Sequence, residues 1–228
     1  MEQNNLQPLL ESVRTVGVVK PRFDPLKKAF EPPRLEIFGT GFWLKDGVFI
    51  TCEHVVQKIQ NMPIDLAGML VVGGNRKPYR KASISVVDSV HDLAVLIIEP
   101  ENEEDQDVLN QEIEKGLELN ANSISVGEKI AYAGYPMGNL LLNEVHSPTY
   151  AEGVIGSEII EGGLGPKTIQ ISGPVIGGYS GAPIVRKDNP MKVVSVVSHS
   201  PSQEAGQASI FRGVHWKHID ALVKLMSS

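Results

Sequence analysis

The chain has a single cysteine, Cys52, in 228 residues. An intramolecular disulfide and a zinc site built from several cysteines are therefore both excluded. Secreted domains commonly carry disulfides, so a lone thiol favours a reducing compartment. The N-terminal residues 1–8 also lack a charged region followed by an apolar stretch, which argues against a signal peptide. We therefore expect a cytoplasmic location.

Long apolar runs and an excess of positive charge are also lacking. No apolar run approaches the ~20 residues that a membrane-spanning helix needs, so no membrane partner is expected. Lys and Arg total 21 against 27 Asp and Glu, which gives a net charge of −6 and disfavours nucleic acid as a partner. Hydrophobic residues make up 42% of the chain, which is enough for a core and excludes a disordered chain.

Short segments rich in Val and Ile account for most of the chain after residue 35. They are separated by Gly, Asn, Asp and Pro, and they do not alternate with helical patterns. This texture is typical of an all-β sandwich or barrel. The expected strands are 36–38, 41–45, 48–52, 70–72, 82–88, 93–99, 129–134, 149–160, 168–172, 183–186, 193–199 and 210–214.

Three segments depart from this strand pattern. Residues 1–35 are predicted to form an N-terminal extension, with a short helix at 6–13 followed by prolines that interrupt regular structure. This extension is a candidate docking segment for a regulatory protein partner. The acidic segment 100–118 is predicted as a solvated linker. Residues 216–226 repeat apolar side chains at helical spacing and predict a C-terminal amphipathic helix.

Three motifs carry residues suited to nucleophilic catalysis. His54 follows an apolar strand, Asp92 precedes another, and Ser180 lies in a glycine-rich turn. Each alone fits a structural role. Together they provide a nucleophile, a general base and a carboxylate that orients the base. The backbone N–H groups of Gly178 and Ser180 are expected to form an oxyanion hole.

The sequence offers weaker candidates for a second nucleophile and for a zinc site. Cys52 lies in a strand and is expected to pack in the core rather than act as a nucleophile. His215 and His218 form an H-x-x-H pair without a third ligand, so we expect surface residues rather than a zinc site. Neither a metal nor an organic cofactor is expected.

The motifs together resemble the trypsin-like (chymotrypsin-fold) serine peptidases, and most closely the HtrA/Deg-type catalytic domain and stand-alone trypsin-like peptidase domains. The matching segments are Gly39-Thr40-Gly41-Phe42 and residues 50–56, 92–96, 126–128, 133–138 and 178–183. The resemblance implies two packed six-stranded antiparallel β-barrels, with His54 and Asp92 from the first and Ser180 from the second. The first barrel and the acidic linker would span 36–118, and the second barrel with the C-terminal helix would span 119–228. With 228 − 180 = 48 residues after Ser180, no PDZ domain is expected.

The implied activity is that of a serine endopeptidase, which cleaves proteins or peptides through an acyl-enzyme on Ser180. An alternative is a catalytically silent or partner-activated peptide-binding module. The sequence gives no oligomeric state.

Pro174 stands where trypsins place an acid, so cleavage after Arg or Lys is not expected. Tyr179 replaces the usual Asp or Asn before the serine, so zymogen-type activation is not expected. By the resemblance, the substrate pocket is lined by Pro174, Val175, Ile176, Gly177, Val197, Ser198 and His199.

Overall fold

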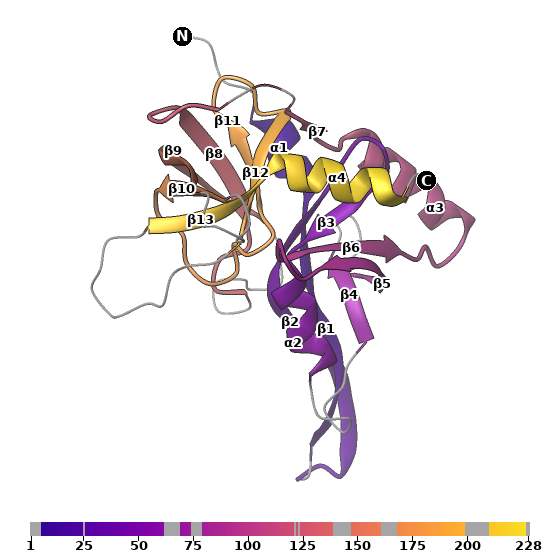
Figure 1. Cartoon of the computed structure of the whole chain (residues 1–228). Coiled ribbons are helices and arrows are strands. Elements are labelled where there is room, and N and C mark those ends of the chain that lie inside the picture. The colour runs from indigo at the N-terminus through magenta and orange to yellow at the C-terminus, as the bar shows by residue number, and fades with distance from the viewer. Residues whose placement is uncertain are drawn as a thin grey trace.

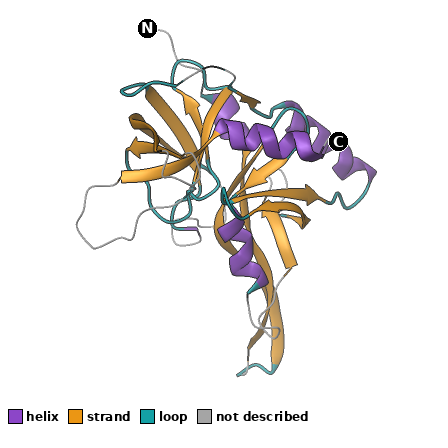
Figure 2. Cartoon of the chain, viewed as in Figure 1, coloured by secondary structure: helices purple, strands orange, loops and turns teal. Residues whose placement is uncertain are grey.

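Strands dominate the computed structural model (Figure 2). It describes residues 6–24, 26–61, 69–73, 79–120, 122, 124–138, 147–160, 168–198 and 210–226. Among these residues, no helix is long and apolar enough to cross a membrane. The strands fall into two groups, which lie on either side of the molecule in Figure 1.

The first group is a closed antiparallel barrel in the order β1-β2-β3-β6-β5-β4. Its interior is filled by side chains that are fully buried, such as Phe42, Phe49 and Ile50. The β3 and β6 strands are buried along almost their whole length, because one face fills the barrel and the other is covered by the rest of the molecule. The strands are β1 (Val13–Asp24), β2 (Ala29–Trp43), β3 (Phe49–Thr51), β4 (Met69–Gly73), β5 (Arg80–Asp88) and β6 (Leu93–Ile98).

The second group runs in the order β11-β8-β9-β10-β13-β12, and pairing of β11 with β12 closes it into a second six-stranded barrel. The short strand β7 (Glu118–Leu119) is added outside, parallel to β12. The barrel strands are β8 (Lys129–Gly134), β9 (Thr149–Ile160), β10 (Thr168–Ser172), β11 (Pro183–Arg186), β12 (Lys192–Val197) and β13 (Ile210–His215). The predicted fold of two six-stranded antiparallel barrels is therefore confirmed.

The first barrel begins at residue 13 and not at residue 36, the predicted start. After helix α1 (Gln7–Ser12), residues 13–35 form β1 and the first part of β2, so they are barrel strands and not an extension. The two strands form a long hairpin that projects beyond the body of the molecule (Figure 1). Its prolines are tolerated because the ladder is interrupted between Lys20 and Arg22, opposite Pro32 and Pro33.

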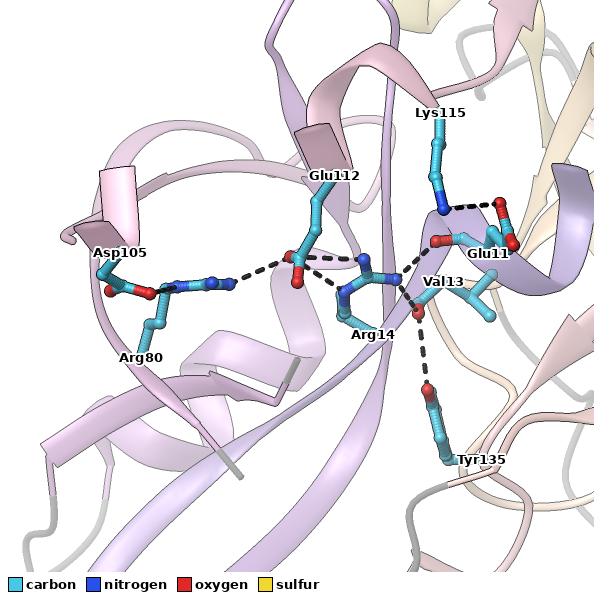
Figure 3. A network of polar contacts seen from close by, with 8 residues as sticks. All are labelled: Glu11, Val13, Arg14, Arg80, Asp105, Glu112, Lys115 and Tyr135. Carbon is cyan, nitrogen blue, oxygen red and sulfur yellow. Dashed lines mark hydrogen bonds and ion pairs between the residues drawn. The ribbon is translucent and has the colours of Figure 1, made fainter. Parts of the chain in front are cut away.

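The acidic segment is an ordered helix, α3 (Glu103–Glu114), rather than a solvated linker. Two of its carboxylates are buried and form a row with two buried arginines, in the order Asp105, Arg80, Glu112 and Arg14 (Figure 3). Arg80 contacts Asp105 at 2.9 Å and Glu112 at 2.9 Å, and Arg14 contacts the same Glu112 oxygen at 3.2 Å. Because two positive and two negative charges balance, each ion is compensated despite its burial.

The chain passes from α3 to the second barrel through a stretch that is bonded to both barrels. Leu117 exchanges backbone hydrogen bonds with the first barrel, from its N–H to Trp43 O and from Lys45 N to its carbonyl, both 2.9 Å. Glu118 N and Asn120 N then donate to Met191 O and Val193 O in the second, both at 2.8 Å.

The C-terminal helix is confirmed as α4 (Trp216–Met226), and Ile219 and Leu222 bury its apolar face. It starts at the end of β13 and runs toward the side of the molecule that holds α3 (Figure 1).

The ion network makes a testable contribution to stability. Glu112→Ala leaves Arg14 and Arg80 without their shared carboxylate, so we expect a loss of about 3–5 kcal/mol in the free energy of unfolding, measured with urea. The control is Glu114→Ala on the exposed face of the same helix, which should change stability by about 0.5 kcal/mol or less. Equal losses in the two variants would contradict a special role for the network.

Candidate active site

His54 lies in the first turn of helix α2 (Glu53–Gln60), not at the end of a strand as the sequence analysis expected. The apolar residues that follow explain the difference. Val55, Val56 and Ile59 are buried on one face of α2, and their spacing fits a helix that packs on the barrel. His54 therefore projects from the N-terminal end of a helix that is packed on the barrel.

Asp92 caps this helix from the turn between β5 and β6. The N-cap residue Cys52 makes no side-chain cap. Instead, the Asp92 carbonyl accepts from Glu53 N at 3.3 Å, and its Oδ1 accepts from His54 N at 2.9 Å. These are two of the donors that a helix start leaves without intrahelical partners. Asp92 reaches them from a left-handed backbone conformation, with φ at 56°, which a short polar residue tolerates.

The side chains of His54 and Asp92 also meet directly. His54 Nδ1 lies 2.8 Å from Asp92 Oδ2 and 3.0 Å from Oδ1, and Ser198 Oγ donates to Oδ2 at 2.5 Å. Burial raises the pKa of Asp92, but the hydrogen bonds from His54 and Ser198 outweigh it, so the pKa lies below its ordinary value. The side chains keep 23% and 16% exposure, so the pair remains within reach of a ligand.

Ser180 comes to this pair from the second barrel, in the turn before β11. Its Oγ donates a long hydrogen bond of 3.5 Å to the carbonyl of Ser198. Ser198 thus contacts Asp92 through its hydroxyl and Ser180 through its backbone, which brings the three predicted residues to one place. The sequence analysis assigned Ser198 to the substrate pocket and missed its bond to Asp92, because no local pattern marks a contact between residues 106 positions apart.

The backbone of the oxyanion turn, defined here as residues 177–181, is held by its carbonyls. Among the described residues, the N–H groups of Gly178 and Ser180 donate to no protein acceptor, whereas the four carbonyls from Gly177 to Ser180 all accept hydrogen bonds. This leaves both N–H groups available for a negatively charged oxygen. The donors are Met137 N to Gly177 (2.6 Å), Thr40 Oγ1 to Gly178 (2.8 Å), Ala182 N to Tyr179 (2.8 Å) and Thr40 N to Ser180 (2.8 Å).

The predicted pocket residues fall into two sets. Val175, Val197 and Ser198 are buried, with exposures of 6%, 1% and 8%. Pro174, Ile176 and Gly177 are exposed and precede the oxyanion turn or begin it. His199 lies outside the described residues, so its predicted role in the pocket stays a prediction.

Cys52 is buried and donates from Sγ to Val197 O at 3.2 Å. Its Sγ lies with ligand atoms of His54 and Asp92 in a group that spans at most 4.8 Å, the one candidate metal cluster among the described residues. Burial raises the pKa of the thiol well above its ordinary value, which disfavours the thiolate that both a metal and a nucleophilic attack require. The contact fits the predicted packing role.

Of the two histidines of the H-x-x-H pair, which were predicted as surface residues, His215 is buried and His218 is partly exposed. His215 is 3% exposed, and its Nδ1 accepts from Lys217 N at 3.2 Å. His218 stacks on His91, with 3.8 Å between ring centroids. Because β13 ends and α4 begins between them, the two rings are directed to different neighbours rather than to a shared ion.

Two closed barrels, with a His–Asp pair on the first and a serine turn on the second, define the architecture of trypsin-like peptidases. Residues 39–194 match the family described as the trypsin-like peptidase domain, and the chain belongs to this family.

Among solved structures, the fold is similar to "HtrA-type protease AlgW with decapeptide", with a TM-score of 0.73 and 17% sequence identity. The match covers 97% of this chain and 66% of the other, so this chain spans just under two thirds of its length. Identity at this level shows a common fold alone. Among curated protein sequences, none gives a significant match to the chain.

The hydrogen bond from Ser198 gives a test of the carboxylate environment. Ser198→Ala should raise the pKa of Asp92, because one donor to the ionised form is lost. Ser195→Ala is the matched control, since that hydroxyl donates to Val214 O instead. The measurement is a ¹³Cγ chemical-shift titration of Asp92 by NMR.

The sign of the accompanying stability change follows from the lowered pKa. Asp92 contributes stability above its unfolded-state pKa of about 3.9, and this is lost as the pH falls through the lower folded-state value. Ser198→Ala should therefore reduce the loss of stability in acid. An unchanged Asp92 pKa in Ser198→Ala, or an equal shift in Ser195→Ala, would contradict this reading.

Proposed function

We propose that the chain is a serine endopeptidase that hydrolyses peptide bonds through an acyl-enzyme on Ser180. The observation that carries the proposal is the 2.8 Å contact between His54 Nδ1 and the Asp92 carboxylate, linked through Ser198 to Ser180. A carboxylate on Nδ1 fixes the imidazole tautomer, which leaves Nε2 as the base for a serine hydroxyl. The family of the chain supports the same chemistry.

In the proposed mechanism, Ser180 Oγ attacks the carbonyl carbon of the substrate while His54 takes the hydroxyl proton. The negative charge that develops on the carbonyl oxygen is stabilised by the N–H groups of Gly178 and Ser180. His54 then gives its proton to the leaving amine. In the second half, His54 takes a proton from water while the water oxygen attacks the acyl carbon. The ester bond to Ser180 Oγ then breaks, and His54 returns the proton to Oγ. Asp92 stays ionised throughout and stabilises the imidazolium.

We propose peptides or proteins as substrates, bound beside Pro174, Val175, Ile176 and Gly177 and along Val197 and Ser198. The solved relative carries a decapeptide, which supports an extended peptide as ligand. Exposed Ile176 adds apolar surface next to the oxyanion turn.

The alternative is a peptide-binding module that is silent until a partner activates it. One observation favours it: a serine hydroxyl has a single proton, and that of Ser180 is donated to Ser198 O rather than to a base. The first 35 residues remain the proposed contact for such a partner. The hairpin of β1 and β2 projects beyond the body of the molecule (Figure 1). Leu26, in the turn between the two strands, is 94% exposed.

Covalent labelling tests the nucleophile. We expect a fluorophosphonate probe to label the wild-type protein on Ser180. Labelling and peptide hydrolysis should fall by about 10³-fold or more in Ser180→Ala, His54→Ala and Asp92→Asn, because the triad acts as a unit. Thermal unfolding of each variant checks that the fold is kept. Absence of wild-type labelling that is restored by cell extract would favour the partner-activated module, and full activity of Asp92→Asn across a pH series would contradict the triad.

Cleavage of a peptide library tests the specificity. We expect products that end in small or aliphatic residues and not in Arg or Lys, because residues 174–177 carry no carboxylate to pair with a cation. Mass spectrometry of the products gives the residue before each cleaved bond. Preferred cleavage after Arg or Lys would refute this assignment.

A further inference from the structure

Thr40 is the one residue of the first barrel that hydrogen-bonds to two carbonyls of the oxyanion turn, among the residues that the structure describes. Its N–H donates to Ser180 O at 2.8 Å, and its hydroxyl donates to Gly178 O at 2.8 Å. The same hydroxyl oxygen accepts from Tyr135 N at 3.0 Å. Thr40 is fully buried in β2. One side chain of the first barrel therefore contacts two loops of the second.

The direction of each bond is fixed by chemistry. A backbone N–H can only donate, so the Thr40 oxygen must accept from Tyr135. Its single proton is then free for Gly178 O, which as a carbonyl can only accept. The three groups form a short chain from Tyr135 N–H through the Thr40 hydroxyl to the Gly178 carbonyl.

The carbonyl of Gly178 belongs to the peptide that lies between the two proposed oxyanion donors. The two donors themselves lie on the peptides before and after it, Gly177–Gly178 and Tyr179–Ser180, whose carbonyls accept from Met137 N and Ala182 N. The Gly178–Tyr179 peptide joins these two, so its orientation, through ψ of Gly178 and φ of Tyr179, helps to set their directions relative to each other. Gly177 and Gly178 have no side chains that could restrain the backbone by packing. Gly178 adopts φ of 103°, and a Cβ there would lie 2.2 Å from Tyr135 O. The Gly178–Tyr179 peptide is held by hydrogen bonds instead, at its carbonyl by Thr40 Oγ1 (2.8 Å) and at its N–H by Ile176 O (3.3 Å).

We propose that the Thr40 hydroxyl is a positioning residue for the oxyanion hole, which holds the Gly178–Tyr179 peptide in the orientation that lets both N–H groups meet the substrate oxygen. This inference rests on the proposed function and deepens it. Because Thr40 acts through the backbone and does not touch substrate, its loss should slow the chemical step and leave the binding of the peptide chain unchanged.

The test compares Thr40→Val, which keeps the shape and removes the hydroxyl, with Thr40→Ser, which keeps the hydroxyl. On a fluorogenic peptide chosen from the library, Thr40→Val should lose about 10- to 100-fold in kcat with KM within twofold, while Thr40→Ser keeps most of the activity. Thr51→Val is the matched control. It is an equally buried threonine on β3 whose hydroxyl donates at 2.7 Å to a carbonyl of its own barrel, that of Thr40. It should retain kcat.

A second measurement does not depend on catalysis. Thr40→Val in a Ser180→Ala background should speed amide hydrogen exchange at Tyr135, whose N–H loses its acceptor, and Thr40→Ser should not. If Thr40→Val does not fold, Thr40→Ala enters the same two measurements. Unchanged exchange at Tyr135, or a loss of activity carried by KM alone, would overturn the proposal. If the wild type hydrolyses nothing, the proposed function fails, and the exchange data still test whether the Thr40 hydroxyl makes the bond to Tyr135 that directs its proton to Gly178 O.

Discussion

The Asp92 carboxylate is the contact on which the arrangement of the site depends. It accepts from the backbone and the ring of His54 in the first barrel and from Ser198 in the second. One side chain therefore starts helix α2, orients the imidazole and joins the two barrels. The energetic cost of placing a carboxylate in a half-buried turn is met by these donors, which also keep it ionised. Because helix α2 packs on the barrel, it holds His54 more rigidly than a loop would.

The barrels divide the work of the site between side chains and backbone. In the proposed mechanism, the first barrel supplies an imidazole and a carboxylate from α2 and the turn before β6, whereas the second supplies a hydroxyl and two backbone N–H groups from the oxyanion turn. Backbone donors have no rotamers, so their directions depend on what holds the carbonyls on the same peptides. The carbonyls on those two peptides, Gly177 O and Tyr179 O, accept from Met137 N and Ala182 N, and Thr40 of β2 holds the carbonyl of the peptide that follows each of them. Chemistry placed in one barrel is thus set by packing against its neighbour.

Helical spacing in the sequence predicted the terminal helix, and the resemblance carried by the short motifs implied the two barrels. The same motifs name His54, Asp92 and Ser180, which Ser198 links in the structure. The sequence did not predict the strands in residues 13–35. Prolines there suggested irregular structure, although the β-branched residues Val13, Val16 and Val18 favour a strand. The burial of Glu112 could not be predicted for a different reason. Its partners Arg14 and Arg80 lie 98 and 32 residues away, and only the closed barrel brings them together. Contacts set by topology, such as that of Ser198 with Asp92, leave no trace in the local sequence.

The stretch 117–120, which passes between the barrels, is not a tether. Its backbone is bonded on one side to Trp43 and Lys45 and on the other to Met191 and Val193, and β7 extends the second barrel as an extra strand. Swinging one barrel away from the other would break these hydrogen bonds within four residues. The connection consequently cannot serve as a hinge. At this point of the chain the two barrels are bonded through the backbone into one frame.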